Sequence, residues 1–416
     1  MNDKILFIES NTSGSGMQAI EIAKQLNLDP VLFTNNSQRY LGLENTNCHV
    51  IQCDPNNFEE IKSLINKEVN SHNIKGITTT SEFYIGVVSE LCEHFGFISN
   101  NPIAVDIARN KIKTRKTLVE NGLLQPEFYY SNNLYDIESL LVKLGVPCII
   151  KPIDDSGSND VLYCDNIEEA FLHCKKIMKK TYNSRGQKHS NFVLIEEFIN
   201  FPEFSVEMLV INKEIITVGI TQKYLTGFPY FVEEKHIFPA DLNKIEEEKI
   251  ISTVKKAIEV IGLDNGPVHT EVKLTPKGCL IIEINARLAG GMIPELILHS
   301  TGVNLIEQQI LNCINQDITK YYPKTLTSGI HFFTSDIEGN PYSVDYYNSL
   351  SDNPLVKSIE IYNNNISSSK PKNAYDRLGY VIAADKDRNA IIRFLDSVKK
   401  NKTLIIQEVG HDRTKK

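Results

Sequence analysis

The sequence lacks several features that would place it in a familiar class at once. It has no tryptophan and no CxxC pair, and its eight cysteines are scattered, several of them within apolar runs. A disulfide framework and a zinc site are therefore disfavoured, and reduced, buried thiols in a cytoplasmic protein fit better. The sequence also has no GxxxxGK[ST] motif, and the glycines of residues 13–16 do not have GxGxxG spacing, so neither common nucleotide-binding fingerprint is present.

Long apolar runs and an excess of basic charge are missing as well. No stretch approaches the ~20 apolar residues of a membrane span, and the first residues do not resemble a secretory leader. The 44 Lys and Arg are outnumbered by 52 Asp and Glu, which gives a formal net charge of −8. Extended nucleic-acid binding needs clustered basic residues, so we expect neither a nucleic-acid partner nor a membrane partner. Local basic clusters can still bind a nucleotide.

A chain of 416 residues is long enough for two or three domains. In the first hundred residues, short apolar runs alternate with helical apolar spacing, which favours a parallel, doubly wound sheet. The strands expected there are residues 4–8, 31–33, 49–52 and 76–79. A helix over residues 103–121 follows, and later strands are expected at 127–130, 148–151, 192–196, 205–211, 215–222, 270–274, 280–284, 329–334, 356–362, 379–384 and 403–408.

The acidic hairpin of residues 269–287 carries the clearest chemistry. Side chains repeat with period two along a strand, so Glu283, Asn285 and Arg287 share one face, and pairing of the two strands brings Glu271 beside Glu283. Two carboxylates and an amide oxygen are ligands that suit Mg²⁺. The alternative is an exposed hairpin with ordinary charges. It is weakened because Ile282 and Ile284 make the other face strongly apolar.

Arg287 lies just beyond these candidate metal ligands, where its planar guanidinium suits an anionic group that carries a phosphoryl. Gly290 and Gly291 follow and allow the backbone to approach a ligand closely or to adopt positive φ. A plain strand-to-helix turn is the alternative for the two glycines taken alone.

Three further segments are compatible with nucleotide binding. Lys151 ends an apolar strand, and a buried ammonium needs an anion such as a phosphate. The loop that follows, with Ser156, Gly157 and Ser158, offers backbone N–H groups to phosphates, although such loops are more often turns. Lys111 lies on a helix where a solvated basic face is the default interpretation, and His236 is either a phosphate donor or a structural histidine.

The segment Glu196, Glu197, Phe198 and Ile199 ends another apolar strand, and its backbone can present hydrogen-bonding groups to an adenine edge. Glu203 can accept hydrogen bonds from ribose hydroxyls. Considered singly, this region would be read as a strand and a turn.

Taken in order, these segments resemble the ATP-grasp superfamily of carboxylate–amine ligases over about residues 100–330. The matching residues are Lys111, the run 149–152 with 156–158, the run 196–199 with Glu203, and Glu271 with Glu283, Asn285 and Arg287. Residues 269–271 and 287–294 look especially like the branch of bacterial L-amino-acid ligases, which make dipeptides. One departure from the family pattern is Asp154-Asp155, which makes the phosphate loop more acidic than in many members.

The resemblance implies an α/β fold, α+β in the ATP-binding part. The four expected parts are an N-terminal doubly wound domain (1–101), two ATP-clamping subdomains (102–190 and 191–325) and a β-rich C-terminal module (326–416). It further implies that Lys111 and Lys151 contact phosphates, that Ser156–Ser158 close over them, that residues 196–199 line the adenine site and that Glu203 contacts the ribose. Glu271 and Glu283 would bridge magnesium, and Arg287 with the Gly290–Gly291 backbone would hold an acyl phosphate.

The activity implied is ATP-dependent amide formation between amino acids or similar molecules, with ADP and phosphate as products. The cofactors would be ATP and Mg²⁺, with Mn²⁺ as a possible substitute, and a homodimer is possible by analogy. Two alternatives remain: an ATP-grasp ligase of the biotin-carboxylase or purine branch, and a non-catalytic nucleotide-binding protein. The complete set of Glu271, Glu283 and Arg287 disfavours the second alternative.

Overall fold

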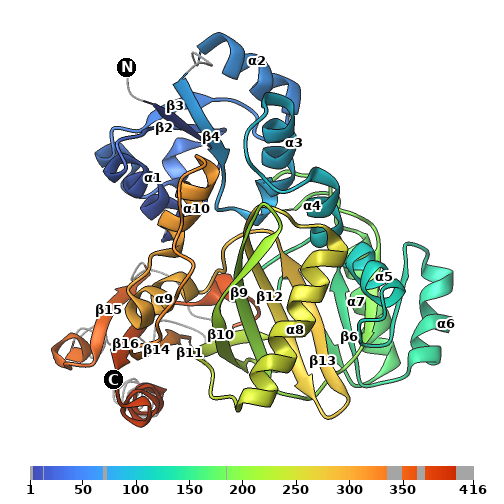
Figure 1. The fold of residues 1–416 in the computed structure, drawn as a ribbon. Helices are drawn as coiled ribbons and strands as arrows, with labels where there is room; N and C mark the ends of the chain where they lie inside the picture. Colours follow the sequence, from blue (N-terminus) through green and yellow to red (C-terminus); the bar gives the residue numbers. More distant parts are fainter. Residues whose placement is uncertain are drawn as a thin grey trace, which may run out of the picture.

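The computed structural model describes residues 3–12, 14–68, 73–183, 185–334, 349–362 and 371–399. Their strands form three sheets, two of four strands and one of eight, with helices packed against them (Figure 1). The mixed fold predicted from the sequence, α/β with a parallel N-terminal sheet and α+β in the part that follows, is confirmed, and the later sheets are antiparallel. The expected strand at 403–408 lies outside the described residues.

The N-terminal sheet is parallel, with strand order β3-β2-β1-β4. Along β1, Ile5 and Phe7 enter one apolar core while Leu6 and Ile8 enter another. Such a strand is buried on both faces and needs helices on both sides of its sheet. The elements are β1 (Lys4–Ile8), α1 (Ser15–Gln25), β2 (Asp29–Thr34), η1 (Ser37–Arg39), η2 (Leu43–Asn45), β3 (His49–Gln52), α2 (Phe58–Glu68), β4 (Ile74–Thr78), η4 (Glu82–Tyr84) and α3 (Ile85–Phe95).

The second sheet is antiparallel, with order β5-β8-β6-β7. Helices α6 and α7 share an apolar core with it, in which Ile137, Ile150 and Cys174 are fully buried. The elements of this region are α4 (Pro102–Arg109), α5 (Lys111–Glu120), β5 (Phe128–Ser131), α6 (Leu134–Leu144), β6 (Cys148–Pro152), β7 (Leu162–Cys164), α7 (Ile167–Met178) and β8 (Val193–Glu197).

The single helix expected over residues 103–121 is interrupted at Asn110. Its side chain accepts hydrogen bonds from the backbone N–H groups of Ile112 and Lys113, so Asn110 is the N-cap of a second helix. Lys111 is therefore the first residue of α5, and its backbone N–H donates to the carbonyl of Ile153 beside β6. The break turns Lys111 from the expected solvated face into a buried position, with 8% of its surface exposed.

The largest sheet has eight antiparallel strands in the order β13-β12-β9-β10-β11-β14-β16-β15. The late strands thus continue the same hydrogen-bonded sheet as the acidic hairpin, and the predicted division into four parts stays a prediction. The elements are β9 (Glu203–Ile211), β10 (Glu214–Thr226), β11 (Val232–Phe238), α8 (Lys244–Ile261), β12 (Gly266–Thr275), β13 (Gly278–Asn285), α9 (Ile293–Thr301), α10 (Leu305–Cys313), β14 (Thr327–Phe333), η5 (Leu350–Asp352), β15 (Val356–Ile361), η6 (Ala374–Asp376) and β16 (Gly379–Asp385), followed by helical residues 388–399.

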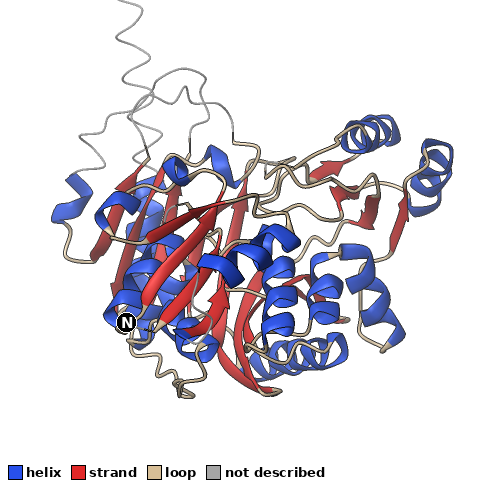
Figure 2. Cartoon of the chain, turned by 90° about the horizontal axis from the view of Figure 1, so that it is seen from above, coloured by secondary structure: helices blue, strands red, loops and turns tan. Residues whose placement is uncertain are grey.

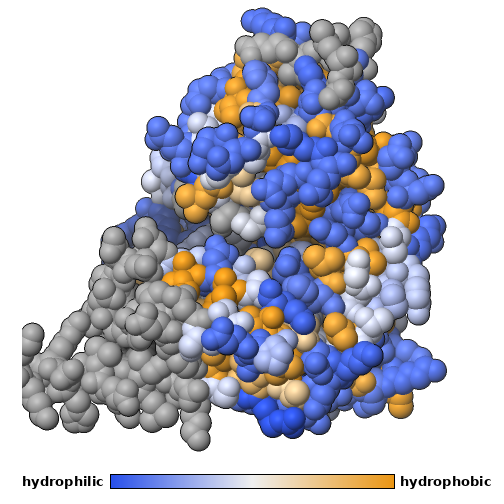
Figure 3. Space-filling model, turned by 90° about the vertical axis from the view of Figure 1, so that its left-hand side faces the viewer, coloured by the Kyte–Doolittle hydropathy of each residue, from blue (hydrophilic) through white to orange (hydrophobic). Residues whose placement is uncertain are grey.

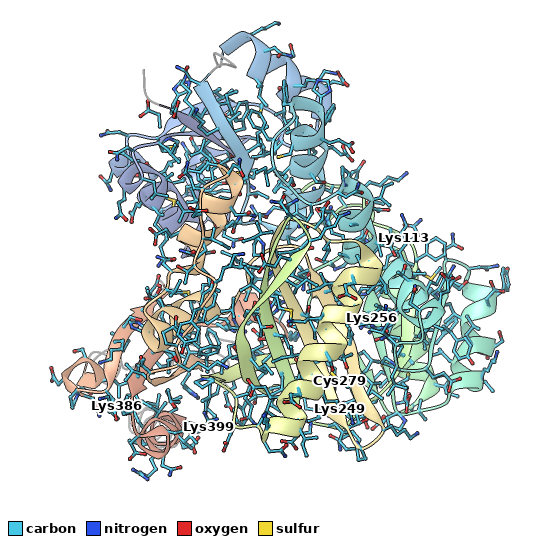
Figure 4. The ribbon with its side chains drawn as sticks, in the orientation of Figure 1. Lys113, Lys249, Lys256, Cys279, Lys386 and Lys399 are labelled. Carbon is cyan, nitrogen blue, oxygen red and sulfur yellow. The ribbon has the colours of Figure 1, made fainter. Side chains whose placement is uncertain are left out.

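Helix α8 covers the outer side of the hairpin, where Lys249 and Lys256 of α8 and Cys279 of β13 are labelled in Figure 4. Ile250, Val254 and Ile258 of α8 pack in one core with Ile281 and Ile284 of β13. This packing leaves the opposite side of the hairpin free to face a cavity.

Helix α10 returns from the late part of the chain and lies beside α1 of the N-terminal sheet (Figure 1). Figure 2, coloured by secondary structure, shows helices packed around the strands. Ile306 and Ile310 of α10 share a core with Ile20 of α1. On the face drawn in Figure 3, hydrophilic residues surround small groups of hydrophobic ones. Among the described residues, no helix combines the length and the apolar character needed to cross a membrane.

Candidate active site

A cavity lies between the four-stranded antiparallel sheet and the hairpin end of the eight-stranded sheet. Its wall contains every predicted site residue except His236: Lys111, Lys151, Ser156, Gly157, Ser158, Glu196, Glu197, Phe198, Ile199, Glu203, Glu271, Glu283, Asn285, Arg287, Gly290 and Gly291. Residues that are far apart in the sequence are thus brought to one site, as the sequence predicted.

The acidic hairpin has the expected register, with Glu271 directly opposite Glu283. Val272, however, pairs with Ile281, so Ile282 is an extra residue on its strand and forms a β-bulge. Ile282 lines the cavity with Glu283, whereas Ile284 stays in the core. The expectation that Ile282 shares the buried face with Ile284 was wrong, because the bulge changes the alternation at this point.

Glu271 is held as an anion by a buried cation. The Lys223 Nζ lies 2.6 Å from its Oε1, and His269 Nε2 lies 3.5 Å away. Burial alone would raise the pKa of Glu271, but Lys223 and His269 outweigh burial and lower this pKa. Burial would lower the pKa of His269, but hydrogen bonding to Glu207 (Nδ1–Oε1 2.8 Å), with Glu271 nearby, raises it to about 9.

Lys223 also contacts Glu203 (2.9 Å) and Glu233 (3.1 Å), so three carboxylates surround one ammonium. Burial disfavours its charge, but the three carboxylates raise the pKa of Lys223 well above its ordinary value. Lys223 therefore stays charged and organises the acidic side of the cavity.

Lys151 forms the centre of a second, fully buried charge group. Its Nζ lies 2.6 Å from Glu196 Oε2, and Arg115 Nε lies 2.6 Å from the other oxygen of the same carboxylate. Burial, together with the nearby Arg115 and Lys111 charges, lowers the pKa of Lys151, while Glu196 opposes this shift. Burial would raise the pKa of Glu196, but the two cations lower it to about 2. The Glu196 carboxylate is thus engaged by two cations.

Arg115 extends this group to the hairpin. Its Nη1 donates to the carbonyl of Ile281 at 2.8 Å and its Nη2 to the carbonyl of Ile282 at 2.9 Å. The bulge beside Glu283 is therefore tied to Glu196 and Lys151 through one guanidinium.

The loop after β6 is shaped by its own acidic residues. Asp155 accepts hydrogen bonds from Ser156 N (2.9 Å) and Asn159 Nδ2 (2.6 Å), and its carbonyl accepts one from Lys111 Nζ (3.0 Å). Gly157 and Ser158 have positive φ of 69° and 58°. The Asp155 carboxylate, noted in the sequence as unusual for this loop, thus forms hydrogen bonds within the loop itself.

At the opposite end of the cavity, Phe198 packs edge-on against Tyr163 with ring centroids 4.8 Å apart. The carbonyl of Ile199 accepts a hydrogen bond from Lys273 at 2.9 Å, and Glu203 lies 3.7 Å from the same ammonium. The adenine role of residues 196–199 and the ribose role of Glu203 remain predictions.

Arg287 is paired with Glu82, a residue of the N-terminal region. The Arg287 Nε to Glu82 Oε2 distance is 2.5 Å. Burial alone would lower the pKa of Arg287, but Glu82 and Glu283 raise it. The amide nitrogen of Asn285 donates to Glu283 Oε1 (3.0 Å) and Glu82 Oε2 (3.2 Å). Glu82 therefore contacts both Arg287 and Asn285, one of the predicted metal ligands.

Of the two glycines after Arg287, Gly291 has the expected positive φ and close neighbours, whereas Gly290 has neither. Gly291 has φ 59°, and a Cβ on it would lie 3.0 Å from His236 Nε2 and 3.4 Å from Glu233 Oε2. His236 itself is fully buried behind this loop. Its Nε2 lies 3.7 Å from Glu233 Oε2, and neither ring nitrogen has a hydrogen-bond partner within the part of the chain that the structure describes. Burial lowers the pKa of His236 in spite of the nearby Glu233. The structure thus places His236 next to the cavity wall, where contact with a ligand requires the loop to move.

Comparison with known proteins agrees with this geometry. Residues 144–295 match the model of the ATP-grasp domain. The chain contains an ATP-grasp domain. The superfamily predicted from the sequence is thereby confirmed.

The chain is 25% identical to the uncharacterized protein y4rH of Sinorhizobium fredii over 392 residues, 93% of this chain and 80% of that protein. It is 28% identical to the alanine–anticapsin ligase of Bacillus subtilis over 255 residues, which span 57% of this chain and 54% of that ligase. Its fold matches the L-amino acid ligase of Bacillus licheniformis with a TM-score of 0.81 at 21% identity, over 96% and 97% of the two chains. These matches confirm the predicted resemblance to the L-amino-acid ligase branch and, at that general level, the prediction of an ATP-dependent ligase.

The acidic residues of the ATP-grasp cavity offer oxygen ligands of the kind that magnesium prefers. Among the described residues, no group of three or more His, Cys, Asp or Glu side chains forms a metal cluster by itself. Glu271 and Glu283 nevertheless lie opposite each other, with Asn285 on the same strand. Such a set fits an ion that keeps waters and phosphate oxygens in its shell, as Mg²⁺ does.

Several charged residues of the ATP-grasp cavity or its support were missed from the sequence, among them Glu82, Arg115, Lys223, Glu233, Lys273 and Arg377. Glu82 follows the β4 strand, and the carboxyl ends of parallel strands commonly carry site residues, so a signal was present for it. Arg115 lies in a basic helical run that was read as solvated, and nothing local distinguishes it from Lys113.

Proposed function

We propose that the protein is an ATP- and Mg²⁺-dependent carboxylate–amine ligase that joins amino acids or amino-acid-like molecules. One observation carries the proposal: buried lysines, an opposed carboxylate pair and a guanidinium beside Glu82 line a single cavity. The lysines suit phosphates, the carboxylates suit a metal, and the Arg287–Glu82 pair suits a molecule that carries both a carboxylate and an ammonium.

In this proposal, Lys111 and Lys151 bind phosphate oxygens and Ser156, Gly157 and Ser158 cover them. Residues 196–199 take the adenine and Glu203 the ribose. Glu271, Glu283 and Asn285 hold magnesium, which when bound neutralises phosphate charge and aligns the reacting groups.

The first substrate carboxylate attacks the γ-phosphorus of ATP, the bond from that phosphorus to the bridging oxygen breaks, and ADP leaves. Arg287 and the Gly290–Gly291 backbone hold the acyl phosphate that forms. An amine then attacks the acyl carbon, the carbon–oxygen bond to phosphate breaks, and the amine loses a proton. Burial of the site protects the acyl phosphate from water.

A screen of amino acid pairs for phosphate release, with mass spectrometry of the products, tests the proposal. The expected products are ADP, phosphate and a dipeptide-like amide, and Glu283→Ala should abolish phosphate release. Glu248→Ala, which removes an exposed carboxylate on α8, is the matched control and should leave the rate unchanged. Formation of AMP and pyrophosphate would overturn the acyl-phosphate mechanism.

A further inference from the structure

The cavity has a second guanidinium, supplied by Arg377 of the C-terminal segment. Arg377 lines the cavity together with Ala374 and has 8% of its surface exposed. It follows the one-turn helix η6, and the next residue, Leu378, is fixed by a backbone hydrogen bond to the Phe333 carbonyl at 2.8 Å. The position of Arg377 is therefore set by the end of the eight-stranded sheet.

The neighbours of Arg377 fix the orientation of its planar guanidinium. Its Cζ lies 3.8 Å from the centroid of the Phe332 ring, and its Nη2 donates to Glu233. Among the described residues, its buried Nε has no hydrogen-bond partner. A guanidinium carries five N–H donors, and buried donors without partners are costly, so this arrangement is suited to receive a planar anion.

Glu233 lies between the Arg377 guanidinium and the loop that contains Gly291. Glu233 lines the cavity, contacts Lys223 at 3.1 Å, and lies 3.4 Å from the position of a Cβ on Gly291. Gly291 is in the loop that follows Arg287. A carboxylate and a guanidinium that touch each other therefore stand beside the loop to which the acyl phosphate is assigned.

We propose that Arg377 binds the carboxylate of the amine-donating substrate, with Glu233 facing its amine. The amine donor is then itself an amino acid, or an amine with a carboxylate a few bonds away, and not a simple amine or an amino amide. Each arginine then binds a different substrate. Arg287 binds the carboxyl group that is activated, and Arg377 binds the carboxylate of the amine donor, which does not react. This inference rests on the proposed ligase function.

The test uses the amino acid that releases phosphate fastest as amine donor, together with its amide and the corresponding decarboxylated amine. The wild-type protein should use the amino acid at least about tenfold better, because the amide and the decarboxylated amine leave the buried Nε donor of Arg377 without an acceptor. Arg377→Ala should raise KM for the amine donor by about ten- to hundredfold while KM for ATP and for the activated amino acid stays near wild type. It should also remove the preference over the amide.

Arg377→Lys keeps the charge without the planar fork and should recover part of the preference. Arg393→Ala, an arginine with 69% of its side chain exposed, is the matched control and should change none of these values. Equal use of the amino acid and its amide by the wild-type protein would overturn the inference while leaving the ligase function in place. If no pair of amino acids releases phosphate, the ligase function itself fails, and the inference fails with it.

Discussion

The two charged groups on opposite sides of the cavity are built differently. On the side of the four-stranded sheet, Glu196 is bonded to both Arg115 and Lys151, and its side chain is 4% exposed. On the hairpin side, Glu271 and Glu283 have side chains that are 21% and 23% exposed and face the cavity. Both oxygens of the Glu196 carboxylate are engaged internally, so Glu196 serves as a fixed support. The hairpin side keeps oxygen atoms available for an ion and its ligands.

The difference shows that burial of charge alone does not identify the reacting residues. Glu196 has the more complete set of ionic partners, yet its carboxylate has little left to offer a ligand. Among the described residues, Glu283 has one cation within 4 Å, Lys111 at 3.5 Å. This loose pairing suits the metal-binding role predicted for Glu283.

The largest effect on stability is expected from removal of Arg115, which supports Glu196. Arg115→Met removes one of the two cations bonded to Glu196 and the donor to two bulge carbonyls. We expect a loss of about 3–5 kcal/mol in the free energy of unfolding. Denaturant titration measures this loss. Lys113→Met, on the exposed face of the same helix (Lys113 is labelled in Figure 4), should change stability by less than about 0.5 kcal/mol. Similar losses from both variants would contradict the supporting role of Arg115.

The hairpin side should show the reverse pattern, with activity lost and stability kept. Arg287→Ala should lower kcat by about 10²- to 10³-fold, because a donor to the developing charge is removed. The ATP dissociation constant, measured by calorimetry, should change by less than about threefold. An equal loss of turnover and ATP affinity would instead place Arg287 in nucleotide binding or in folding.

The smallest expected effect is a pH dependence on the hairpin side. The pKa of His269 is raised to about 9 in the folded protein, so its contribution to stability is complete below its unfolded pKa of about 6.5 and is lost as pH rises toward 9. The contribution is at most about 3 kcal/mol. The unfolding midpoint of the wild type should therefore fall from pH 6.5 to 9 more steeply than that of His269→Gln. His49→Gln, at an exposed position, serves as control and should follow the wild-type curve.

The sequence predicted the sheets well because their strands are apolar runs with clear boundaries, such as residues 4–8 and 148–151. It also predicted the pairing of Glu271 with Glu283, because strand alternation and a short turn fix the register of a hairpin. The bulge at Ile282 was not predictable in the same way. It is held by Arg115, a residue 166 positions from Ile281, and local alternation contains no information on such a contact.

Lys111 and Arg377 illustrate a second limit. Lys111 was assigned by resemblance alone, and its burial depends on the cap at Asn110 and on the Ile153 carbonyl. Arg377 enters the cavity only because β14 and β16 extend the sheet that carries Glu233. Both positions follow from the tertiary arrangement, which no short motif encodes.

The continuous eight-stranded sheet has a consequence for which substrates fit. Neighbouring strands are spaced about 4.8 Å apart by backbone hydrogen bonds, and the hairpin strand β12 is separated from β11 by β9 and β10. The separation between Glu271 on β12 and Glu233 on β11 is thus set by the spacing of the strands, which cannot widen without breaking backbone hydrogen bonds. For the proposed ligase, we expect longer or shorter substrates to be accommodated by changes in side-chain size along β10 and β11, and not by expansion of the sheet.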